Sequence, residues 1–154
     1  MSFTMQHKWT ILCERIIVDE TSQLLSLIDV IEDINIPALP CDDKNITVVP
    51  IRWVLVNFWA RTDETIPEYA EIKIRLVSPI ETVVAERELK IDLTEKVNLR
   101  HFFRSGELPV QGEGTYRFII EINNDGVWEI VSETPYRVNV MPVTETQPSP
   151  SNNV

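Results

Sequence analysis

Glycine, histidine and cysteine are scarce in this sequence, and each shortage argues against a class of functional site. Among 154 residues there are 4 glycines, 2 cysteines and 2 histidines. No glycine-rich loop precedes a helical pattern, so we expect neither a P-loop nor a dinucleotide-binding turn. The two histidines form neither an HxH nor an HExxH pair, which argues against a histidine-rich zinc site. The sequence therefore predicts no cofactor and no metal.

Long apolar runs are also lacking. The most apolar segment, residues 53–60, is less than half of the roughly 20 residues that span a bilayer, and an arginine brackets it at each end. Near the N-terminus, Glu14 and Arg15 interrupt the one apolar stretch that resembles a signal peptide. The sequence therefore predicts a cytoplasmic protein that does not contact a membrane.

Basic residues are in the minority. The chain has 14 lysines and arginines against 24 aspartates and glutamates, which gives a formal net charge of −10. A surplus of this size repels phosphate backbones and anionic lipid surfaces within a Debye length. We therefore expect neither nucleic acid nor a membrane as a partner, and the same surplus favours solubility.

The clearest pattern that is present lies between residues 106 and 140. Residues 115–123 alternate between two faces, and one face carries only large apolar side chains, as in a half-buried strand. These side chains are Tyr116, Phe118, Ile120 and Ile122. Asn124-Asp125-Gly126 then tolerates the positive φ angles of a hairpin turn. We predict that residues 127–131 return as a second strand, that residues 136–140 form a third, and that the three close one edge of a sandwich.

Shorter patterns fill the rest of the chain. Runs that are rich in β-branched residues or alternate in polarity predict strands at residues 9–19, 24–32, 46–61, 69–77, 81–91 and 98–104. Pro50 is expected to mark a bulge or to break its run into two strands. Residues 24–32 also fit a helical period, so a helix is the alternative there. An acidic residue three positions after Asp92 predicts one helical turn at residues 92–95.

Together these patterns predict an all-β fold, an antiparallel β-sandwich of about eight strands that is immunoglobulin-like or C2-like. One domain is expected over residues 1–142, because about 150 residues suffice for a single core without disulfides. Residues 143–154 are dominated by proline, serine, threonine and asparagine, and we expect them to form a disordered tail. The low glycine content favours a sandwich over a barrel.

Two long segments support the same fold, LCERIIVDETSQLLSLIDVIEDINIP at residues 12–37 and GTYRFIIEINNDGVWEIVSETPYRVNV at residues 114–140. In these segments the chain resembles a family of small uncharacterised bacterial β-sandwich proteins that start with a hairpin and end in an immunoglobulin-like or C2-like edge. The matching residues are structural ones. The resemblance therefore implies a fold and no known activity or ligand.

Few residues suggest catalysis. Cys13 and Cys41 have neither CxxC spacing nor the density of a disulfide scaffold, and we predict that they are reduced thiols. A nucleophile pair of Cys13 with His101 is the one catalytic alternative that we keep. His7, His101 and the cysteines have no recognisable metal-ligand spacing. The protein is therefore predicted not to be an enzyme.

Two kinds of ligand site stay open. Acidic pairs in predicted loops are reminiscent of the converging loops that bind calcium in C2-like sandwiches, although solvated turns also explain them. The pairs are Asp19-Glu20, Asp42-Asp43, Asp63-Glu64 and Asn124-Asp125. Four tryptophans are enough to build an aromatic platform for a sugar or a peptide, although core packing explains them as well. They are Trp9, Trp53, Trp59 and Trp128.

The strand at residues 52–61 provides the candidate interface. Both of its faces are apolar, whereas a two-layer sandwich buries only one face of each sheet. We predict that Trp53, Leu55 and Trp59 face outward and join two copies of the chain in a homodimer. The alternative is that loop 33–45 folds over these side chains.

The leading functional hypothesis is a non-catalytic interaction or assembly module. It would bind a second copy of itself or an unknown protein partner, because few titratable residues fall in apolar surroundings and nothing in the sequence points to a reaction. The alternatives are a sandwich that binds carbohydrate or calcium, and then a cysteine-dependent enzyme.

Overall fold

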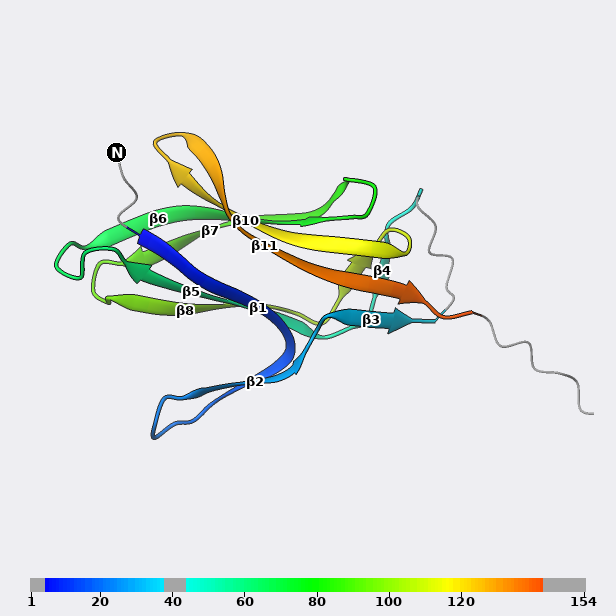
Figure 1. Ribbon diagram of the computed structural model, residues 1–154, viewed down its shortest axis with the longest axis horizontal. Coiled ribbons are helices and arrows are strands. Elements are labelled where there is room, and N and C mark those ends of the chain that lie inside the picture. Colours follow the sequence, from blue (N-terminus) through cyan, green and yellow to red (C-terminus); the bar gives the residue numbers. More distant parts are fainter. Residues whose placement is uncertain (1–4, 38–43, 143–154) are drawn as a thin grey trace, which may run out of the picture.

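The computed structural model describes residues 5–37 and 44–142. All the regular secondary structure in these ranges is β-strand. Figure 1 shows the two larger sheets as two layers that face each other. This confirms the predicted all-β sandwich, and these ranges contain no helix that is able to cross a bilayer. The strands are β1 (Met5–Val18), β2 (Leu25–Val30), β3 (Asp33–Ile36), β4 (Thr47–Val49), β5 (Trp53–Arg61), β6 (Glu68–Val77), β7 (Val83–Leu93), β8 (Asn98–Ser105), β9 (Leu108–Val110), β10 (Gly114–Asn124) and β11 (Val127–Val140).

Two large sheets and one short ribbon make up the fold. The first large sheet has the strand order β2-β1-β5-β8, the second has the order β3-β11-β10-β6-β7, and β4 pairs with β9. The strand pairs are antiparallel apart from β3 with β11, which is parallel. The strands outnumber the expected eight, in part because the segment around Pro50 separates β4 from β5, as predicted.

The β10–β11 hairpin has the predicted turn but not the predicted position. Asp125 and Gly126 take φ angles of 51° and 89°, as a two-residue turn between twisted strands requires. The sequence predicts that this hairpin closes an edge, yet β10 pairs with β6 and β11 pairs with β3, so both strands lie inside the second sheet. The edge prediction is wrong because β3, which follows β1 and β2 of the first sheet in the chain, joins the second sheet beside β11.

Strand β11 is one continuous strand of 14 residues rather than the two strands that its sequence predicts. Its pairing with β10 shifts register between Ile120 and Glu121, which leaves Val131 as an extra residue on β11. Such a bulge exchanges the two faces of a strand. The change of apolar phase after residue 131 therefore marks a bulge and not the end of a strand.

The core lies between the inner faces of the two large sheets. Tyr116, Phe118, Ile120 and Ile122 are all buried there, as their alternation predicts. From the opposite sheet, the Trp53 ring centroid lies 5.0 Å from that of Phe118. The predicted inner face of β10 is thus confirmed.

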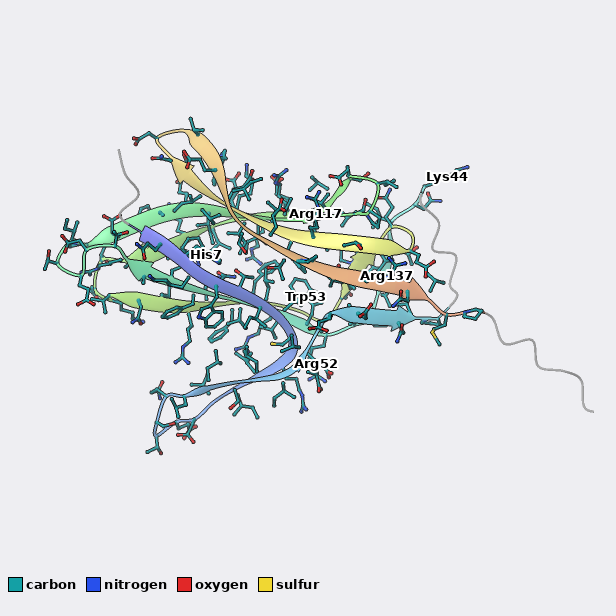
Figure 2. The ribbon with its side chains drawn as sticks, in the orientation of Figure 1. His7, Lys44, Arg52, Trp53, Arg117 and Arg137 are labelled. Carbon is teal, nitrogen blue, oxygen red and sulfur yellow. The ribbon has the colours of Figure 1, made fainter. Side chains whose placement is uncertain are left out.

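Trp53, Leu55 and Trp59 belong to this core, which corrects the predicted dimer interface. Their exposed fractions are 4%, 0% and 0%, and Figure 2 shows Trp53 between the two layers. The alternation along β5 is as predicted, but two apolar faces do not reveal which one points inward. The larger side chains fill the space between the sheets, and the smaller Val54 and Val56 point the other way. A dimer cannot use Trp53, Leu55 and Trp59 without opening the core.

The first strand bends and carries a hairpin, which we call the N-terminal arm, residues 14–30. Up to Cys13 the strand β1 pairs with β5, and from Cys13 onward it pairs with β2, so the predicted hairpin is confirmed over the helical alternative. Figure 1 shows the arm turning back below β5 and β8. Near its tip, the Arg100 guanidinium of β8 donates to the main-chain oxygen of Gln23 at 2.9 Å. The arm is therefore tied to the outer side of the first sheet.

The segment after β7 holds a side-chain turn instead of the predicted helical turn. Asp92 Oδ1 accepts hydrogen bonds from the Thr94 main-chain N and from Thr94 Oγ1, at 2.9 and 2.6 Å. An aspartate that caps a helix uses the same acceptor as an aspartate in such a turn. The prediction is wrong because the sequence pattern does not distinguish the two.

Candidate functional site

The outer face of β5 is covered by the N-terminal arm. Val54 and Val56 are 5% and 0% exposed although they point away from the core. With Cys13 they form a second apolar cluster, against which Ile16, Leu25 and Leu27 of the arm pack. The cover that a strand with two apolar faces needs thus comes from the arm. Of the predicted loop 33–45, residues 33–36 form β3 in the other sheet, and residues 38–43 lie outside the described residues.

An apolar groove stays open between the outer half of the arm and the sheet, and we call it the arm groove. Trp9 and Phe58 line it as a stacked pair, with ring centroids 5.6 Å apart and ring planes inclined by 23°. The groove has a volume of about 430 Å³, and its lining is completed by Ile11, Leu25, Leu27, Asn98 and Arg100. Arg100 adds a positive charge to a surface on which Asn98 is the other polar residue and the rest are apolar.

Cys13 and His101 lie on opposite faces of the first sheet. Cys13 pairs with Val54 and shares the outer cluster, whereas His101 pairs with Asn57, whose face points toward the core. Burial raises the pKa of the Cys13 thiol, and its Sγ donates to the Arg15 main-chain oxygen at 3.4 Å. The nucleophile pair of Cys13 with His101 is therefore not assembled. Cys41 lies outside the described residues.

A row of polar side chains crosses the inner face of the first sheet. Thr10, Asn57 and His101 stand side by side on β1, β5 and β8. Asn57 Oδ1 accepts the Trp59 indole N–H at 3.0 Å, and the His7 ring Nε2 lies 2.6 Å from Thr10 Oγ1. Desolvation by burial lowers the pKa of both histidines, and the nearby Arg87 lowers that of His101 further. Both histidines are therefore neutral at pH 7, and the polar row forms part of the interior of the sandwich.

Two of the acidic pairs stabilise their own turns. Asp19 Oδ1 accepts the main-chain N–H groups of Thr21 and Ser22, and Asp63 Oδ1 accepts the main-chain and hydroxyl groups of Thr65. These bonds to the ionised form lower the pKa of both carboxyl groups. Among the described residues, no three histidine, cysteine, aspartate or glutamate side chains gather as metal ligands. The pair Asp42-Asp43 lies outside the described residues.

The four tryptophans do not form one platform. Trp53 and Trp59 are in the core, and Trp128 lies under the Lys73 ammonium group, 4.2 Å from its ring centroid. Trp9 lines the arm groove, and the other three tryptophans do not. The sequence does contain a signal for that groove, namely a second apolar face on β5 and an apolar run at residues 24–28, but nothing in the pattern says that the two meet.

Comparison with known proteins does not place the chain in a family. No model of a protein family matches this sequence, and no curated protein matches it. Among solved structures, the chain is similar to a glycosyl hydrolase family 2 member from Bacteroides cellulosilyticus DSM 14838, with 14% identity and a TM-score of 0.43. That match covers 60% of this chain and 14% of the hydrolase. A second structure of a family 2 member from Bacteroides cellulosilyticus gives 13% identity, the same TM-score of 0.43, and coverage of 60% and 13%. Since this chain corresponds to a small part of those enzymes, their activity is not carried over.

Proposed function

We propose that this protein is a non-catalytic binding module of the immunoglobulin-like type, which holds a short segment of a protein partner in the arm groove. The observation that carries the proposal is the groove itself, an open apolar recess of about 430 Å³ beside a stacked Trp9–Phe58 pair. Clefts of this volume hold drug-sized ligands, and aromatic side chains are enriched at the centres of interfaces. The separation of Cys13 from His101 supports a role without catalysis.

The immunoglobulin-like type is favoured over the C2-like type by one side chain. The Tyr116 hydroxyl donates to the Gly112 main-chain oxygen at 2.7 Å and accepts the Gln111 main-chain N–H at 2.6 Å. A tyrosine near the start of the penultimate strand that bonds to the backbone a few residues upstream is the tyrosine corner of immunoglobulin-type sandwiches. Tyr116 meets this description, because β10 is the last strand but one.

The expected partner segment carries a large apolar side chain next to an acidic one. The apolar side chain matches Trp9, Phe58 and Leu27, which line the groove. The acidic one matches Arg100, whose guanidinium has five N–H donors and commits one of them to Gln23. The net negative charge of the protein repels acidic ligands in general. The local positive charge of Arg100 therefore favours ligands that place an acidic side chain at this point of the groove.

The free Cys13 thiol is compatible with a cytoplasmic location.

A peptide-display selection on the full chain tests the proposal. Selected peptides are expected to share an apolar anchor with an acidic neighbour. Leu25→Arg places a charge in the groove and should weaken their binding at least about tenfold, because a desolvated charge opposes an apolar anchor. The matched control is Ile17→Arg, since Ile17 lies on the same arm but is 54% exposed. Peptides that bind both variants as tightly as the native chain would contradict the proposal.

A second copy of the chain is the other candidate occupant of the groove. Light scattering separates this outcome, because the single chain has a mass of 17.8 kDa and a dimer has twice that mass. A dimer that Leu25→Arg dissociates, while Ile17→Arg leaves it intact, would assign the groove to self-association in place of a foreign segment.

A further inference from the structure

Three arginines gather around a second hollow, at the base of the arm. Arg15 comes from the arm, Arg52 from the residue before β5, and Arg104 from β8. The hollow has a volume of about 480 Å³, and Glu14, Trp53 and Ser105 also line it. Figure 2 shows Arg52 beside the bend at the base of the arm. The hollow lies at the opposite end of β5 from the arm groove, so the two are separate sites.

These arginines have no acidic partner among the residues that the structure describes. Elsewhere in the chain, arginines and lysines with a carboxylate in reach do form ion pairs. Arg75 lies 2.9 Å from Glu121, Arg117 lies 2.6 Å from Glu81, and Lys73 lies 3.5 Å from Glu88. In a protein with a net charge of −10, a hollow lined by three arginines and one glutamate is a local reversal of charge. Its positive field is available to an external anion.

The surroundings of the hollow hold its lining in place. The Arg104 guanidinium carbon lies 5.5 Å from the ring centroid of Phe102. The Trp53 indole N–H donates to the Glu107 main-chain oxygen at 2.8 Å, and Ser105 Oγ donates to the same oxygen at 2.9 Å. Arginines that stack on a ring lose less conformational freedom when they bind a ligand. The site is therefore partly organised before an anion arrives.

The charge of the hollow points to the class of anion. Three guanidiniums and the Glu14 carboxylate leave a net of two positive charges. A phosphate monoester carries about −1.5 to −2 charges at pH 7 and three acceptor oxygens, whereas a carboxylate carries one charge. Arginine forks match the geometry of phosphate oxygens. We propose that Arg15, Arg52 and Arg104 form a binding site for a phosphoryl group, carried either by a small molecule or by a phosphorylated peptide.

Titration of the full-length, isotope-labelled protein at about 0.15 M salt, where the Debye length is about 8 Å, tests the site. The probes are pyrophosphate for a small-molecule source and a phosphoserine peptide for a protein source, with the unphosphorylated peptide and its glutamate analogue for comparison. The indole N–H resonance of Trp53 should shift with at least one phosphorylated probe, while that of Trp128, on the other sheet, should not. Arg52→Gln and Arg104→Gln should each weaken binding about tenfold or more, the usual loss for a charge-assisted hydrogen bond.

The matched control is Lys96→Gln, which removes an exposed positive charge from a loop outside the hollow. It should leave the dissociation constant within about twofold of the native value, because surface charges at a distance are screened. The proposal is overturned if neither phosphorylated probe shifts Trp53, if Lys96→Gln weakens binding as much as Arg52→Gln, or if the glutamate peptide binds as tightly as the phosphopeptide.

Discussion

Phe118 of the second sheet packs against Trp53 of the first sheet. It is 2% exposed, and its ring centroid lies 5.0 Å from that of Trp53 and 5.7 Å from that of Tyr136. Truncation there leaves a cavity lined by large rings that cannot easily collapse. We expect Phe118→Ala to lower the free energy of unfolding by about 3 to 5 kcal/mol in chemical denaturation. Ile17→Ala, at an exposed position, should change it by less than about 0.5 kcal/mol, and equal effects of the two would contradict the face assignment.

Cys13 reports whether the arm stays closed. Its side chain is fully buried under the arm, and burial raises the pKa of the thiol, so little reactive thiolate is present at pH 7. We expect iodoacetamide to modify Cys13 in the native protein on the order of a hundredfold more slowly than in denaturant. Peptide mapping measures this rate for Cys13 alone. Rapid modification under native conditions would show that the arm opens frequently and would weaken the case for a preformed groove.

At the scale of single elements, the β10–β11 turn depends on its glycine. Gly126 has a φ of 89°, a region that a β-branched residue rarely adopts. Gly126→Val should therefore cost about 1 to 2 kcal/mol of stability, although an added Cβ meets no atom within 4 Å. Gly106→Ala is the matched control, because Gly106 also has open space around it but no positive φ. Thermal melts of the two variants should separate strain from crowding, and equal losses would refute the strain.

The elements of the fold follow from the sequence where one face is apolar and the other polar. The β10 alternation identifies its core-facing residues correctly because one face holds Tyr116 and Phe118 while the other holds Arg117 and Glu121. It misses the burial of Ile119 and Glu121, which lie on that second face and are 4% and 9% exposed. In β5 both faces are apolar, and only the packed structure shows that Trp53 faces inward and Val54 faces the arm. Local alternation carries no information about which distant segment supplies a cover. The groove and the arginine hollow both depend on such distant contacts, and the sequence predicts neither.

For the molecule as a whole, the interior histidines predict how stability depends on pH. Burial lowers the pKa of His7 and His101 in the folded state, so between that lowered pKa and about 6.5 the unfolded chain binds more protons. The stabilisation from neutral histidine is complete above about pH 6.5 and is lost as the pH falls toward the folded pKa. We expect the melting temperature to fall between pH 7.5 and 5.5.

The control for this prediction is a variant that cannot titrate in the same range. His101→Gln should show a shallower fall of the melting temperature over that pH range, whatever its absolute stability. Parallel curves for the native chain and the variant would mean that His101 does not contribute. The lowered pKa values of Asp19, Asp63 and Asp92 act near and below about pH 4 and so do not enter this window.

The parallel pairing of β3 with β11 cannot form during translation until β11, the last strand, has been synthesised. Asn35 pairs with Asn139, and these two residues are 104 positions apart. At about 5 to 20 residues per second, the partner of β3 is synthesised roughly 5 to 20 s after β3 itself. During that interval the strand that follows the arm has no place in the second sheet, and Ile34 and Ile36, which are buried in the finished protein, remain in water. The nascent chain should therefore keep these two apolar side chains exposed until its last strand has left the exit tunnel.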